Sequence, residues 1–265
     1  MQYALCVLTG GRIDTFLRTA VALLVLPAAV VFYSAVVLVI ALAGASTATQ
    51  HGFFVSFART CLRVGGTRLE VRGVEHVEKG RPCVVVSNHA SDWDPVCILA
   101  ALPSLFIRFV AKQQIMRIPI FGHALRLSGN LRVVRTRTAA DVDRIREGMD
   151  RRVPDVSMLF FAEGTRSRDG SLLPFKMGAF AAALAFGLPV LPVAHAGTDA
   201  IWPKGRLRLR RGVVAVEVGE PIPTDGLGFE DRAALRDRTR AAVAVLRSRA
   251  GRRLREQGCD PGGFD

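Results

Sequence analysis

The sequence lacks the signatures of several common enzyme classes. The Gly-Lys-Ser/Thr segment that ends a phosphate-binding P-loop does not occur. No Gly-x-Ser-x-Gly segment supplies a serine nucleophile either. The five cysteines form no Cys-x-x-Cys pair, and the five histidines have no zinc-like spacing to them. We therefore expect no metal site, no resident cofactor and no serine hydrolase.

Lysine is also scarce, since only four of the 36 basic residues are lysines. Against 23 acidic residues, the basic residues give a formal charge of +13. Such an excess favours an anionic partner, which can be nucleic acid, an acidic membrane surface or a phosphorylated substrate. The arginines are spread along the chain, aromatic residues make up 7% of it, and no nucleic-acid-binding motif occurs. We therefore expect no nucleic-acid partner.

Charged residues are missing between Thr19 and Ala58, and residues 20–44 are almost wholly apolar. About 20 apolar residues are enough to cross a bilayer as a helix. The stretch is longer than the roughly 7 to 15 apolar residues of a cleaved signal peptide, so we expect it to stay in the membrane. A spanning helix and a helical hairpin that includes residues 52–58 both remain open. Arginines flank both ends and give no clean orientation, but we expect the rest of the chain on the cytoplasmic face.

Beyond about Gly65, short β-like runs alternate with helical stretches. This alternation predicts an α/β fold with a mostly parallel central sheet flanked by helices, behind the N-terminal membrane-embedded helical segment. We divide the chain into a membrane anchor (1–64), a catalytic domain (65–257) and a disordered tail (258–265). The segment 229–256 predicts an amphipathic helix that lies solvated at the surface. The expected strands are 68–72, 83–87, 106–111, 130–134, 156–162, 190–194 and 213–218, and the other helices are 95–102, 120–127, 138–151 and 178–186.

A histidine and an aspartate follow one of these strands, His89 five positions ahead of Asp94. Histidine accepts a proton near neutral pH, and a carboxylate beside it stabilises the imidazolium that forms. At about 100° per residue the two would not share a helix face, but a turn at a helix entry would bring them together. The alternative is structural: Asp94 caps the helix that Pro95 begins, and His89 is a loop residue.

A second polar segment, residues 160–170, also follows an apolar strand. Gly164 permits unusual backbone conformations, and Thr165 and Arg166 offer a hydroxyl and a forked cation to a phosphate. The alternative for Glu163 and Arg166 is a local salt bridge. Lys176 adds a positive charge at the start of a helix, or is simply exposed.

A third segment, residues 129–135, places arginines on both sides of an apolar pair. Arg135 lies at the strand exit, where ligand sites gather, whereas Arg132 reads as a solvated edge residue. His195 follows another strand, but its sequence neighbours assign it no chemistry. The same holds for the three remaining histidines, His51, His76 and His123.

Together these segments resemble the glycerolipid acyltransferases of the lysophosphatidate acyltransferase type. The first family motif, Asn-His with an aspartate five positions after the histidine, stands at residues 88–94. The second resembles residues 129–135, the third (Phe-Pro-Glu-Gly-Thr-Arg-Ser) stands at 161–167, and the fourth (Val-x-Pro-Val) at 190–193. Two positions depart from the pattern: Ala162 replaces a proline, and Val134 stands where an aspartate often precedes the arginine.

The resemblance implies acyl transfer from acyl-CoA or acyl-carrier protein to the free hydroxyl of lysophosphatidate, giving phosphatidate for phospholipid biosynthesis. His89 would be the general base and Asp94 would orient it. The glycerol phosphate would be held by Arg135, Glu163, Gly164, Thr165 and Arg166. The expected partners are membrane lipids, the lysophospholipid acceptor and the thioester donor. Two alternatives remain: acylation of another lysolipid such as lyso-ornithine lipid, and a non-catalytic membrane protein that binds anionic lipid through its arginines.

Overall fold

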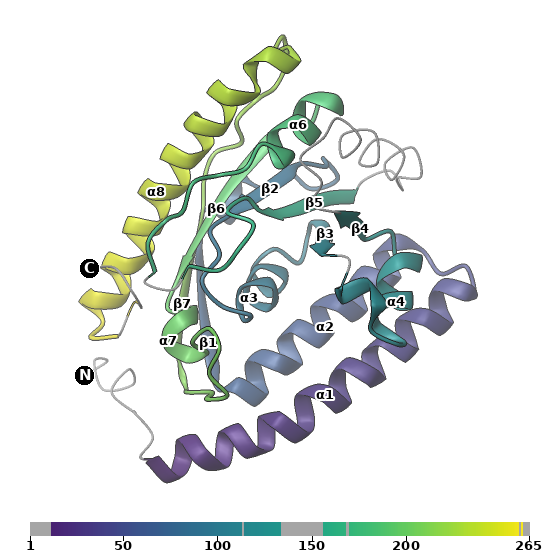
Figure 1. The fold of residues 1–265 in the computed structure, drawn as a ribbon, viewed down its shortest axis with the longest axis vertical. Helices are drawn as coiled ribbons and strands as arrows, with labels where there is room; N and C mark the ends of the chain where they lie inside the picture. Colours follow the sequence, from purple (N-terminus) through teal and green to yellow (C-terminus); the bar gives the residue numbers. More distant parts are fainter. Residues whose placement is uncertain (1–11, 113, 134–155, 168–169, 260, 262–265) are drawn as a thin grey trace.

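The computed structural model describes residues 12–112, 114–133, 156–167, 170–259 and 261. The expected helix 138–151, the predicted site residue Arg135 and most of the tail lie outside these ranges. The first two helices, α1 (Arg12–Leu42) and α2 (Thr47–Gly65), form a hairpin that runs along the lower edge of the molecule in Figure 1. The remaining helices and strands build the layered body above the hairpin.

The central sheet has seven strands in the order β1-β7-β6-β2-β5-β3-β4. Every neighbouring pair is parallel except β6 and β7, which run antiparallel. The predicted α/β fold with a mostly parallel sheet is therefore confirmed. The strands are β1 (Thr67–Arg72), β2 (Val84–Ser87), β3 (Phe106–Lys112), β4 (Leu131–Val133), β5 (Val156–Phe161), β6 (Val190–Ala196) and β7 (Gly212–Val218).

Helices cover both faces of the sheet, so the inner strands are buried on both sides (Figure 1). Val85 of β2 points into a core shared with α2 and α3 (Asp94–Ala101), whereas Val84 and Val86 point into a core with α6 (Gly178–Ala185) and α8 (Arg232–Glu256). A strand buried on both faces needs a continuous apolar run, which explains why residues 83–86 show no polar alternation.

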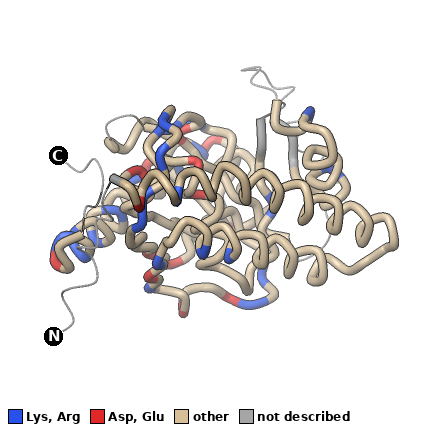
Figure 2. Tube along the Cα trace, turned by 90° about the horizontal axis from the view of Figure 1, so that it is seen from below, with Lys and Arg blue, Asp and Glu red and all other residues tan. Residues whose placement is uncertain are grey.

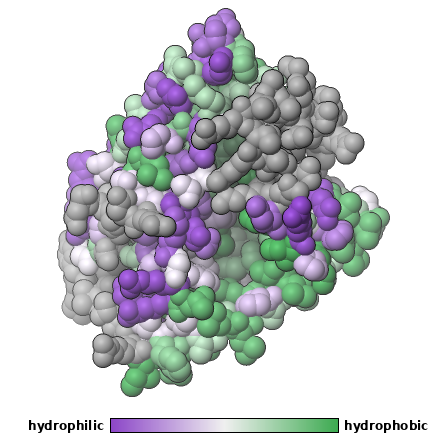
Figure 3. Space-filling view, in the orientation of Figure 1, coloured by the Kyte–Doolittle hydropathy of each residue, from purple (hydrophilic) through white to green (hydrophobic). Residues whose placement is uncertain are grey.

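The hairpin packs through its inner face and exposes apolar residues outward. Tyr33 of α1 places its hydroxyl 3.1 Å from Ser56 Oγ and 3.0 Å from Thr60 Oγ1 of α2. On the outer face, Leu24 is 76% exposed and Val39 is 64% exposed. Figure 3 is green along the lower right edge, where α1 runs in Figure 1, and Figure 2 shows long helical stretches without charge. Among the described residues, α1 alone is long and apolar enough to cross a membrane.

The C-terminal helix differs from the sequence prediction, because it covers the sheet instead of lying solvated. Helix α8 begins at Arg232, and the preceding residues 229–231 form a 3₁₀ turn. It packs on β6 and β7, and Arg253 reaches Glu217 of β7 with 2.7 Å between Nη1 and Oε1. The face of α8 that packs on the sheet includes the charged residue Arg253, so the sequence pattern indicated a polar face. Val243, Leu246 and Leu254 of α8 are buried as well.

The sequence also gave no sign of α7 (Thr198–Ile201). Four residues are too few to show helical periodicity. The remaining short elements are α4 (Phe121–Leu127) and two further 3₁₀ turns, Val74–His76 and Ile115–Arg117.

Candidate active site

The register of three parallel strands brings distant polar residues to one edge of the sheet. Strand β2 lies between β5 and β6, and Ser87 at its end is opposite Phe161 and Val193. The C-terminal ends of parallel strands lie at the same edge of a sheet, and open α/β sheets bind ligands at this edge. The residues two positions beyond these three are His89, Glu163 and His195.

The His89 and Asp94 side chains form a direct pair. His89 Nδ1 lies 2.7 Å from Asp94 Oδ2, so Nδ1 carries a hydrogen and Nε2 is left to accept a proton. The Asp94 side chain is completely buried, whereas the His89 side chain keeps 18% of its surface exposed. The imidazole also stacks on the Phe161 ring at a centroid distance of 4.2 Å. The pair therefore presents one accessible basic nitrogen on a fixed ring.

The helix-cap interpretation of Asp94 is wrong. Its Oδ2 accepts hydrogen bonds from the main-chain N–H groups of Ala90 (2.7 Å) and Ser91 (2.9 Å), which precede the helix. A cap would accept from N–H groups inside the first helical turn. The bonds instead close a tight turn between His89 and Asp94, and this turn brings the two side chains together.

Asp94 is ionised in this environment. Burial alone would raise its pKa, but nearby His195 and the hydrogen bond from His89 outweigh burial and hold the pKa below its usual value. An ionised carboxylate at 2.7 Å stabilises a positive charge on His89 after the ring accepts a proton.

Glu163 is buried beneath the same loop and binds main chain on both sides. Its Oε1 accepts from the His89 N–H at 2.7 Å, and its Oε2 accepts from the Leu173 N–H at 2.9 Å. Burial raises the pKa of this carboxyl group, although the two N–H groups oppose the shift. The expected alternative, a Glu163–Arg166 salt bridge, does not occur among the described residues. Glu163 instead links the loops that follow β2 and β5.

The predicted phosphate-binding residues lie at the surface beside the dyad. Arg166 forms an ion pair with Asp92 through Nη1 and Oδ2, and Thr165 is exposed. Gly164 has φ +68°, and a Cβ there would lie 2.9 Å from the Lys176 ammonium nitrogen, so the Lys176 chain folds over this glycine. The structure thus places Arg166 and Lys176 around the loop that follows β5.

One cation near this loop was missed by sequence reasoning. Lys204 donates from Nζ to the carbonyl oxygen of Arg166 at 2.6 Å. It also lines a cavity of about 530 Å³ that opens beside Ala90, with Ser167 and Arg206 on its wall. A lone lysine in a loop 38 residues from Arg166 gives no sequence signal of this contact.

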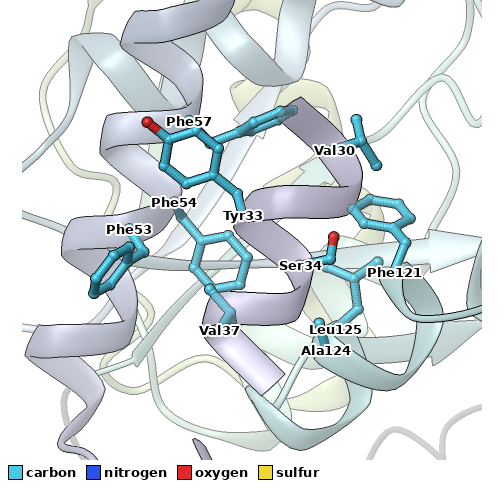
Figure 4. A pocket seen from close by; sticks show the side chains of 10 residues that line it. All are labelled: Val30, Tyr33, Ser34, Val37, Phe53, Phe54, Phe57, Phe121, Ala124 and Leu125. Atoms are coloured by element: carbon cyan, nitrogen blue, oxygen red, sulfur yellow. The ribbon is translucent and has the colours of Figure 1, made fainter. Parts of the chain in front are cut away.

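A second cavity, of about 20 Å³, lies between α1, α2 and α4 (Figure 4). The rings of Phe54, Phe57 and Phe121 close around it, and the Val37 side chain lines its lower end. A space of this size holds about one water-sized group. It is a packing gap inside the hairpin and is too small for an acyl chain.

Comparison with known proteins identifies the family. Residues 68–196 match the Acyltransferase family model. Human 1-acyl-sn-glycerol-3-phosphate acyltransferase beta is 30% identical over 220 residues, which cover 83% of this chain and 79% of that protein. The chain belongs to the acyltransferase family. The resemblance seen in the four motifs is thereby confirmed.

Two further family members extend the comparison. The human alpha form is 35% identical over 182 residues, and the match covers 68% of this chain and 64% of that protein. The crystal structure of the 1-acyl-sn-glycerophosphate (LPA) acyltransferase PlsC from Thermotoga maritima superposes with a TM-score of 0.73 at 26% identity. That match covers 89% of this chain and 97% of that structure.

Glu163→Gln tests the role of the buried carboxylate as a main-chain acceptor. The amide nitrogen of glutamine cannot accept a hydrogen bond, so either the His89 or the Leu173 N–H loses its partner. We expect the free energy of unfolding to fall by about 1–3 kcal/mol. Glu78→Gln, at an exposed pair with Arg81, is the matched control and should change it by less than about 0.5 kcal/mol. Equal effects in chemical denaturation would contradict the role of Glu163.

Proposed function

We propose that this chain transfers a fatty acyl group from an acyl thioester to the sn-2 hydroxyl of lysophosphatidate, giving phosphatidate. The observation that carries the proposal is the His89–Asp94 pair, whose loop is bonded to the loop that carries Arg166: the Ser167 N–H donates to the His89 carbonyl oxygen at 2.8 Å. The names of the relatives support the acceptor, since the two human proteins and the Thermotoga maritima protein described above are all 1-acylglycerol-phosphate acyltransferases.

In the proposed reaction His89 is the general base. Its Nε2 takes the proton from the acceptor hydroxyl while the hydroxyl oxygen attacks the thioester carbonyl carbon. The C–O bond forms, the tetrahedral intermediate collapses, and the C–S bond breaks. The departing thiolate then receives the proton from His89, so the dyad returns to its starting state. Asp94 stabilises the transient imidazolium, and no acyl-enzyme is needed.

The exposed cations would bind the acceptor phosphate. The Arg166 guanidinium is paired with Asp92 at the surface, and a phosphate dianion competes with a single carboxylate for its donors. Lys176 lies over Gly164 and adds a second positive charge, with Thr165 as a hydroxyl donor. Glu163 would act differently from these residues: it positions the His89 loop and does not touch the phosphate. The predicted ligand Arg135 stays a prediction.

The α1 surface would hold the enzyme at the membrane. Helix α1 contacts both α2 and α4, so it stays attached to the body of the protein while its outer face remains apolar. We place this face in the acyl-chain region of one leaflet, with the catalytic domain on the cytoplasmic face. The acceptor and donor then meet His89 close to the bilayer surface.

The assay that tests the function uses detergent-purified protein, acyl-CoA or acyl-carrier protein, and a panel of lysolipids. We expect lysophosphatidate to be acylated, and His89→Ala to lower kcat by roughly 10²- to 10⁴-fold because the general base is lost. His76→Ala is the control, since His76 bonds the Val218 carbonyl oxygen away from this edge. Turnover of lyso-ornithine lipid alone would show that the acceptor is not lysophosphatidate and would leave the proposed chemistry in place. Lipid binding without any turnover would favour a non-catalytic protein.

Arg166→Ala separates phosphate binding from catalysis. The variant loses the forked cation but keeps the dyad, so we expect KM for lysophosphatidate to rise roughly tenfold or more with a smaller change in kcat. Arg81→Ala, which removes an exposed arginine paired with Glu78, is the control and should leave both constants unchanged. A lowered kcat at unchanged KM would contradict a role in acceptor binding.

Membrane attachment through α1 is tested with the double variant Leu24→Arg, Val39→Arg. Two charges on the outer face raise the cost of burial in lipid by several kcal/mol, so we expect the variant to be lost from floating vesicles. The control places the same charges at Val74 and Val245, which are 50% and 52% exposed outside the hairpin. Equal flotation of both double variants would rule out this face as the anchor.

A further inference from the structure

A second histidine lies behind the dyad. His195 belongs to β6, its side chain is completely buried, and its Nε2 is 3.6 Å from Asp94 Oδ1. Asn88 fixes its backbone from both sides: the Asn88 amide donates to the His195 carbonyl oxygen at 3.1 Å and accepts from the His195 N–H at 3.0 Å. His195 is therefore held in place by the residue that precedes His89.

The surroundings of His195 fix which nitrogen carries a hydrogen. Its Nε2 lies 2.9 Å from the Asn88 carbonyl oxygen, and its other close neighbour is the Asp94 carboxylate. Both neighbours can only accept, so Nε2 must be protonated. The Thr198 hydroxyl lies 3.4 Å from Nδ1 and can either donate or accept. An N–H group therefore faces Asp94 whichever charge the ring carries.

The two carboxylate oxygens of Asp94 differ in their hydrogen-bond partners. Oδ2 receives three donors: His89 Nδ1 and the N–H groups of Ala90 and Ser91. Oδ1 is buried and has no hydrogen-bond partner among the described residues. A buried carboxylate oxygen without a donor favours protonation of the group. The His195 N–H at 3.6 Å is too far for a hydrogen bond, but its dipole acts strongly where water is excluded.

We propose that His195 is a positioning residue for acyl transfer, whose Nε2–H faces Asp94 Oδ1 and keeps the carboxylate charged and directed at His89. This inference rests on the proposed function. The two histidines act on opposite oxygens of one aspartate: His89 takes the substrate proton, and His195 supports the aspartate from behind. The other titratable groups near Asp94 are Glu163 after β5 and Cys97 in α3, and the variants below retain both.

The test compares His195→Leu with His195→Gln. Leucine fills the buried site without a donor, whereas the glutamine amide nitrogen can take the place of Nε2 and donate to both neighbours. His51→Leu is the matched control, because His51 is also buried and its Nε2 lies 3.2 Å from a main-chain oxygen, that of Pro103. All variants are first compared by thermal unfolding in detergent, so that a loss of folded protein is measured separately from kcat.

We expect His195→Leu to lower kcat roughly 10- to 100-fold without changing KM for either substrate. Loss of the donor raises the proton affinity of the His89–Asp94 pair, so the acid limb of the kcat/KM profile moves to higher pH. His195→Gln should recover most of kcat and the wild-type acid limb. The His51→Leu variant should lose stability but keep the wild-type kcat and the wild-type acid limb.

A His195→Leu variant with wild-type kcat and pH profile would overturn the inference, as would equal losses in the leucine and glutamine variants. The imidazole proton between His89 and Asp94, followed by NMR, gives a readout that does not need turnover. We expect its resonance to shift in His195→Leu and not in His51→Leu, and an unshifted resonance overturns the inference. Absence of acyl transfer by the wild-type protein would instead overturn the proposed function. The NMR resonance would still test whether His195 acts on the His89–Asp94 pair.

Discussion

The site depends on two buried carboxylates that must be satisfied at one edge of the sheet. Asp94 and Glu163 together accept four main-chain N–H groups, from Ala90, Ser91, His89 and Leu173. Buried acidic groups are costly unless such donors surround them, so the loops after β2 and β5 have little freedom. The same bonds that remove this cost hold His89 in one orientation. Folding of the two loops therefore also fixes the ring that we propose as the general base.

This arrangement separates the groups that hold the site from those that meet the substrate. Asp94, Glu163 and His195 are buried, whereas the His89 and Arg166 side chains retain exposed surface. Arg166 carries its charge on a flexible chain and pairs with the exposed Asp92. A buried charge fixed by main-chain bonds cannot rearrange when substrate arrives, but a surface guanidinium can exchange one anion for another. Under the proposed function, the fixed groups would lie at the proton-transfer centre and the adaptable guanidinium at the phosphate.

Most strands could be predicted because a strand buried on both faces is a continuous apolar run bounded by turn residues. The pairing of His89 with Asp94 was predictable only as one of two alternatives, since the local sequence also fits a helix cap. His195 could not be found at all. Its role depends on β6 lying beside β2, and strand order is set by tertiary packing of residues more than 100 positions apart. The antiparallel direction of β7 and the inward face of α8 were not predicted either, because tertiary packing and not the local residue pattern sets them.

The hairpin and the His89–Asp94 dyad are connected by the packing of Trp93 and α3 on α2. Trp93, the residue before Asp94, is buried against the end of α2, and its indole N–H donates to Thr67 Oγ1 at 2.9 Å. A Cβ on Gly65 would lie 2.6 Å from the same ring, so this contact requires glycine at the last position of α2. Helix α2 also packs along α3, which begins at Asp94. Under the proposed attachment of α1 to the membrane surface, the angle of the hairpin in the bilayer would set the height and direction of His89. Under the proposed function, a lysolipid whose acyl chain stays in the leaflet would then meet His89 at a fixed depth, and this would favour a hydroxyl close to the headgroup phosphate.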